Sequence, residues 1–63
     1  MERLKFIGCY NDDGIFKEEF INNDGSIIIQ KQSEETDIGI IFIGIYLITD
    51  LKTIEKIIYY HTH

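Results

Sequence analysis

An uninterrupted apolar run, Ile38–Ile48, constrains the fold of this chain more than any other feature. Its eleven residues carry no charge and are dominated by isoleucine, phenylalanine and tyrosine. A helix that spans a bilayer needs about 20 apolar residues, so this run is too short to cross a membrane as a helix. Since β-branched and aromatic side chains favour extended backbone, the run predicts a β-strand.

Both faces of this expected strand are apolar, because alternate side chains of a strand point to opposite sides. One row consists of Ile41, Ile43, Ile45 and Leu47. A single domain of 63 residues buries only about 60% of its unfolded surface and has little material to cover two such rows. Cys9 is the only cysteine, which rules out an internal disulfide, and we expect it to be a small buried hydrophobe. Association is the remaining source of stability, and the row above is the predicted homodimer interface.

Turn signals divide the first half of the chain. Asn11–Gly14 and Asn22–Gly25 supply the glycine and asparagine residues that tight hairpins require. Three short strands are predicted around these turns, at residues 4–10, 15–21 and 27–32. The segment 15–21 also fits one helical turn, although the flanking turns favour a strand. Ser33–Asp37 contains no apolar residue and predicts a solvated loop before the apolar strand at 38–48.

The periodicity changes after residue 49. Apolar side chains recur at helical spacing after this point, and His61 continues their row. We therefore expect a helix from about Asp50 to Tyr60, with Thr49 or Asp50 as its N-cap. The last three residues are expected to fray. Within the long strand, Gly39 or Gly44 predicts a bulge or bend. The expected fold is therefore α+β: one domain, residues 1–63, with a four-stranded antiparallel meander and a C-terminal helix (ββββα), completed by homodimerisation.

Charge is concentrated in the middle of the chain. The net charge is −5, and residues 10–37 hold eight carboxylates but only two lysines. Nucleic-acid affinity rests largely on basic side chains, so direct nucleic-acid binding is not expected. The acidic region either keeps an isoleucine-rich protein soluble or contacts a basic surface of a partner protein. The candidate partner-binding residues are Asp12, Asp13, Asp24, Glu34, Glu35 and Asp37.

Catalytic and metal-binding patterns find little support. The chain lacks the four compactly spaced ligands of a structural zinc site, and the two Asn/Asp-rich turns lack the spaced oxygens of a calcium loop. Cys9 and His61 form a weak nucleophile–base candidate, because one is expected in mid-strand and the other at a fraying end. No cofactor, metal site or enzymatic activity is therefore expected.

These features predict a small acidic protein-interaction protein. Its isoleucine-rich, proline-free composition is typical of AT-rich genomes, and the narrower hypothesis is an inhibitor encoded by a phage or mobile element, directed at a host defence or nucleic-acid-processing enzyme. Two alternatives are a structural subunit of a homo-oligomer, joined edge to edge, and a membrane-associated protein. A single cysteine and the absence of an apolar targeting core at the start of the chain favour a cytoplasmic location.

Overall fold

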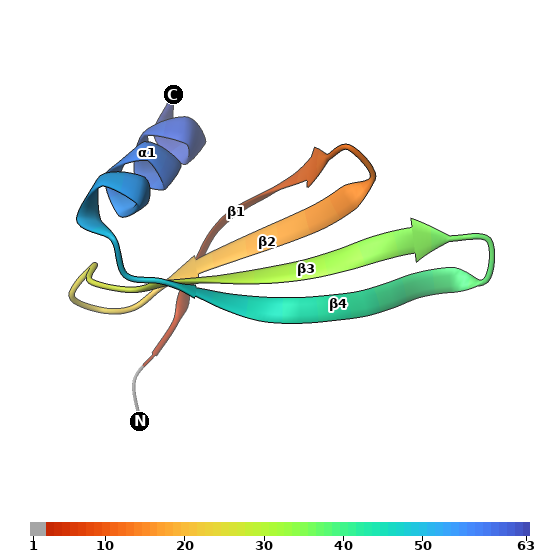
Figure 1. Ribbon diagram of the computed structural model, residues 1–63. Coiled ribbons are helices and arrows are strands. Elements are labelled where there is room, and N and C mark those ends of the chain that lie inside the picture. Colours follow the sequence, from red (N-terminus) through yellow and green to blue (C-terminus); the bar gives the residue numbers. More distant parts are fainter. Residues whose placement is uncertain (1–2) are drawn as a thin grey trace.

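The fold is a single antiparallel sheet followed by one helix, as seen in a computed structural model that describes residues 3–63 (Figure 1). Met1 and Glu2, where the sequence predicts no apolar targeting core, lie outside the described residues. The elements are β1 (Lys5–Asp12), β2 (Ile15–Ile21), β3 (Ile28–Thr36), β4 (Gly39–Ile48) and α1 (Leu51–Thr62). The strands are ordered β1-β2-β3-β4, so the predicted ββββα meander is confirmed, including the strand at 15–21.

The predicted glycine turns connect the first three strands. In the first, Asp13 and Gly14 both have positive φ, at 52° and 89°, and the Gly14 amide donates to Asn11 Oδ1 at 2.9 Å. In the second, Gly25 has φ 73°, and the Asn22 amide donates to the Ile27 carbonyl at 3.1 Å. Two successive left-handed residues match the twist of a tight hairpin, which explains the Asp-Gly pair at the first turn.

The third turn is much shorter than predicted. Ser33–Asp37 was expected to be a loop, but β3 continues to Thr36 and only Asp37 and Ile38 separate it from β4. The polar residues from Ser33 to Thr36 pair with Phe42 to Gly39. The loop prediction is wrong because backbone pairing does not depend on side-chain polarity, and the apolar strand offers this polar segment a partner along its whole length.

Each edge strand contains one irregularity in its pairing. In β4 the register shifts between Gln32 and Ser33 of β3, so that Ile43 is the unpaired residue next to Gly44. The sequence predicts a bulge or bend at Gly39 or Gly44, and the bulge next to Gly44 agrees with this prediction. Gly39, at φ 124°, forms the end of the hairpin turn instead. In β1 the register shifts at Ile7.

Helix α1 covers only part of one face of the sheet (Figure 1). Ile54 is fully buried, as is Ile28 on β3, and they are the only fully buried hydrophobic side chains among residues 3–63. Leu51, one of the apolar residues at helical spacing, is 64% exposed rather than covered by the sheet. One short helix is too narrow to cover four strands, so the core is small and the other sheet face has no covering element within the described chain.

Asp50 begins the helix as predicted. Its carboxylate accepts hydrogen bonds from the Thr53 hydroxyl at 2.8 Å and the Thr53 amide at 3.0 Å. These bonds hold the pKa of Asp50 below its ordinary value of 3.8. The charged form therefore stabilises the folded state above that value, and the contribution is lost as the pH falls through the lowered pKa.

We expect Asp50→Ala to destabilise the helix at pH 7, because it removes both acceptors for the Thr53 donors. The difference in unfolding temperature between the variant and the native chain should shrink as the pH is lowered from 5 to about 2, because native Asp50 then becomes protonated. Thermal unfolding followed by circular dichroism at 222 nm measures this. Asp37→Ala, in the exposed β3–β4 turn, is the control, and its unfolding temperature should differ from that of the native chain by the same amount at every pH. If the unfolding temperature of Asp50→Ala also differs from the native value by a constant amount, the capping role is contradicted.

Candidate functional site

The most unusual surface of the molecule is β4. It is an edge strand, yet Ile40, Phe42 and Ile45 are 76%, 56% and 63% exposed. Leu47 and Ile38 are similarly open to solvent. Soluble monomers rarely expose contiguous apolar patches larger than a few hundred Å², and larger patches mark interaction sites.

The apolar surface continues across the side of the sheet that α1 does not cover, here called the free face. Cross-strand pairing places Phe6, Phe20, Ile29 and Leu47 in one row over all four strands, because paired residues point to the same side. The rings of Phe6 and Phe20 meet edge to face at 5.4 Å. Further members of the free face are Phe16, Ile40, Phe42 and Ile45.

The bulge divides the row predicted as the dimer interface. Ile45 and Leu47 pair with Lys31 and Ile29 and lie on the free face. Ile41 pairs with Glu34 and lies on the side of α1, while Ile43 is the unpaired residue. A strict period of two therefore fails here: all four side chains are exposed, but they do not form one continuous surface.

The acidic candidate residues separate into two groups. Asp12 ends β1 and Asp13 begins the β1–β2 turn, and Glu34, Glu35 and Asp37 lie at the β3–β4 turn. Because alternate turns of a meander lie at the same end of the sheet, these five share one end, here called the acidic end (Figure 1). Asp24 lies in the β2–β3 turn at the opposite end, where it accepts a hydrogen bond from the Ser26 amide at 3.0 Å.

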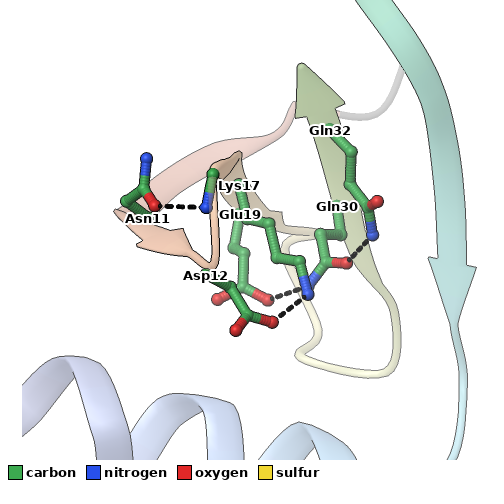
Figure 2. Close-up of polar contacts among 7 residues, drawn as sticks. Asn11, Asp12, Lys17, Glu19, Gln30 and Gln32 are labelled. Carbon is green, nitrogen blue, oxygen red and sulfur yellow. Dashed lines mark hydrogen bonds and ion pairs between the residues drawn. The ribbon is translucent and has the colours of Figure 1, made fainter. Parts of the chain in front are cut away.

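The acidic end is exposed, but one of its carboxylates is already paired. Asp12 Oδ2 lies 2.8 Å from Lys17 Nζ, and this hydrogen bond raises the pKa of Lys17. Figure 2 shows the pair beside the buried polar side chains of β2 and β3. Asp13, Glu34, Glu35 and Asp37 are exposed and are the carboxylates best placed to meet a partner.

The buried polar cluster is a feature that sequence reasoning missed. Glu19 is completely buried, with Oε1 2.7 Å from His61 Nε2 and Oε2 accepting from Gln30 Nε2 at 2.7 Å. Gln32 Nε2 in turn donates to Gln30 Oε1 at 2.7 Å (Figure 2). A carboxylate accepts only, so the His61 ring supplies the proton in its bond to Glu19. Glu19 is therefore not part of the solvated acidic surface, and the expected fraying of the last three residues is wrong for His61.

Gly8 makes room for the histidine. A Cβ atom added to Gly8 would lie 2.2 Å from His61 Nδ1, so only glycine lets the ring approach β1 this closely. His61 also packs near Tyr10, with ring centroids 6.1 Å apart, and Tyr60 meets Tyr10 at 5.2 Å. The spacing of His61 with the apolar helix positions was the signal that pointed to this burial.

The Glu19–His61 pair ties the helix to the sheet. Both carboxylate oxygens of Glu19 are hydrogen-bonded, and the His61 side chain is only 8% exposed. A cavity of about 440 Å³ opens beside the pair. Burial and the nearby Glu19 carboxylate raise the pKa of Tyr10, which lines this cavity. The contact holds the C-terminal part of α1 against β1 and β2.

Other candidate chemistry is dispersed. Cys9 is exposed on the free face rather than buried, since it pairs with Glu18 on the side away from α1. Cys9 and His61 therefore lie on opposite sides of the sheet, and the weak nucleophile–base candidate is wrong. Within residues 3–63, His, Cys, Asp and Glu side chains nowhere gather in a group of three that would hold a metal ion. The described part of the chain also has no helix of the length and apolarity that a membrane span requires.

Comparison with known protein families, curated proteins and solved structures finds no match to this chain.

Proposed function

We propose that this chain is a non-enzymatic protein-interaction protein that works as a homodimer. The observation that carries the proposal is the uncovered apolar surface of β4 and the free face. Only two hydrophobic side chains among residues 3–63 are fully buried, whereas fifteen large ones are exposed. A fold with so small a core gains most from burying its remaining apolar area against another chain.

The total surface supports the same proposal. A monomeric protein of 7.4 kDa is expected to expose about 4,200 Å², but this chain exposes 4884 Å². The excess of roughly 700 Å² is close to the ~800 Å² that each partner contributes to a standard stable interface. A second copy is the simplest occupant, because a two-fold contact presents the same apolar patch from both sides.

The acidic end is the proposed surface for a different partner with a basic binding site. It lies at the tips of two hairpins, and four of its carboxylates are exposed and clustered at one end of the sheet. A surface of this charge imitates the phosphates that a nucleic-acid-processing or defence enzyme binds, and it accelerates the encounter with such a protein. Inhibition of a host enzyme of this kind is the narrower form of the proposal.

Charge reversal tests the role of the acidic end. Replacing Asp13, Glu34 and Glu35 with lysine should weaken capture of the partner from host extract by at least tenfold, with little effect on folding because all three are exposed. Quantitative mass spectrometry of the captured proteins provides the measurement. Asp24→Lys at the opposite end is the control. Equal capture by the triple variant and the native chain would falsify a role for these carboxylates.

The uncovered edge also favours a second candidate, a subunit of an open assembly built by repeated edge pairing. Light scattering over a hundredfold range of concentration distinguishes the two. A closed dimer reaches a constant mass, whereas head-to-tail pairing of β4 with β1 keeps growing. We expect the constant mass, because β1 begins with a charged residue and contacts α1, whereas β4 contains no charged residue.

A further inference from the structure

β4 presents an open strand edge whose one irregularity is the bulge at Ile43. It is the outermost strand of the sheet, so alternate residues direct their backbone N–H and C=O groups away from β3. The strand has ten residues, the most of the four, and contains neither a charged residue nor a proline. Natural sheets normally protect such an edge with lysine, proline, strong twist or a covering element.

The other edge of the sheet is better protected. β1 begins with the charged residue Lys5, whereas the register shift is a feature of both edge strands. Helix α1 also packs against β1, where the His61 ring lies against Gly8. The two edges are therefore not equivalent, which disfavours growth by pairing β4 of one copy with β1 of the next.

The side chains of β4 are exposed on both faces of the strand, which favours a partner that contacts both faces. Ile45 and Leu47 are exposed on the free face, while Ile41 and Tyr46 are 46% and 47% exposed on the side of α1. A second sheet stacked on the free face cannot reach Ile41 or Tyr46. A strand added at the edge lies about 4.8 Å away and places side chains beside β4 on both faces at once.

The position of the bulge is compatible with two-fold pairing. Ile43 lies near the middle of Gly39–Ile48, with regular pairing to β3 on either side. A two-fold axis near this residue places the same irregularity of the two copies side by side. Antiparallel pairing of the two strands then uses the regular stretches before and after it.

We propose that β4 pairs antiparallel with β4 of a second copy, joining the two sheets into one continuous eight-stranded sheet. This inference rests on the proposed homodimer and specifies its geometry. Main-chain hydrogen bonds between the two copies give the contact its register, and the flanking apolar side chains provide most of the buried area. The β1 strands remain as the outer edges of the joined sheet.

Amide hydrogen exchange measured by NMR tests this geometry on the native chain. The protein is kept well above its dimer dissociation constant, and sedimentation is run on the same sample. We expect the amides of residues 40–47 to be protected at least a hundredfold at successive positions, because both edges of β4 are then hydrogen-bonded. Amides of β2, an inner strand, provide the internal reference for full protection.

The outcomes separate the geometry from the dimer itself. A dimer in which every second β4 amide exchanges as fast as an exposed loop overturns edge pairing but leaves the homodimer intact. A monomer in sedimentation overturns both. A monomeric variant, Ile45→Glu, supplies the pattern of an unpaired edge: its β2 amides should stay protected while alternate β4 amides exchange fast.

Discussion

Replacing Glu19 with alanine is expected to lower the free energy of unfolding by about 3 kcal/mol or more, a large part of the stability of a small domain. The substitution leaves Gln30 and His61 without their buried acceptor and opens a cavity between helix and sheet. The loss should be visible as a shift of the urea midpoint, with native and variant chains compared at one protein concentration because dimerisation adds stability.

Glu18→Ala is the matched control for this experiment. Glu18 is the neighbouring residue on β2 but faces the other side of the sheet, where Lys31 lies 3.9 Å away in a partly exposed pair. Such a surface pair contributes about 1 kcal/mol or less. Glu19→Gln, which keeps the shape and one oxygen acceptor, should fall between the two. Equal midpoints for the Glu18 and Glu19 alanine variants would show that the buried pair does not hold the helix in place.

Replacing Ile45 with glutamate is expected to weaken the homodimer by at least about 100-fold. Each buried isoleucine contributes about 1.5–3 kcal/mol, and a two-fold dimer loses two of them at once. The monomer itself should tolerate the change, because Ile45 is 63% exposed and its cross-strand neighbour is Lys31, which glutamate can pair with. Sedimentation velocity over a range of concentrations gives the change in dissociation constant.

Tyr59→Glu is the control for the loss of exposed apolar surface. Tyr59 is 64% exposed, nearly the same as Ile45, but lies near the end of α1. If both variants remain dimeric, the interface lies away from β4. If both become monomeric, the interface includes the helix as well.

The strands and the helix could be predicted because their signals are local. The Asp-Gly turns, the alternation in 15–21 and the helical spacing after Asp50 each depend on neighbouring residues, and all three are confirmed. The polar segment from Ser33 to Thr36 was missed because its structure depends on its pairing with residues 39–42. A polar strand at an exposed hairpin has no periodic apolar signal to reveal it.

The candidate site was predictable only in part. The surplus of apolar surface on the long strand follows from composition and length, and the exposed β4 side chains agree with it. The side of the sheet on which each of these side chains lies could not be predicted, because one bulge at Ile43 reverses the alternation of side chains along the strand. The Glu19–His61 contact joins residues 42 positions apart, and Gly8 gives it room from a third strand, so no local pattern could reveal it.

Sedimentation equilibrium of the native chain at micromolar concentration measures whether the chain is a homodimer. We expect a mass of twice 7.4 kDa that stays constant as the concentration rises. A mass of 7.4 kDa at 10 μM and above, with β4 folded and its apolar side chains open to water, would contradict it.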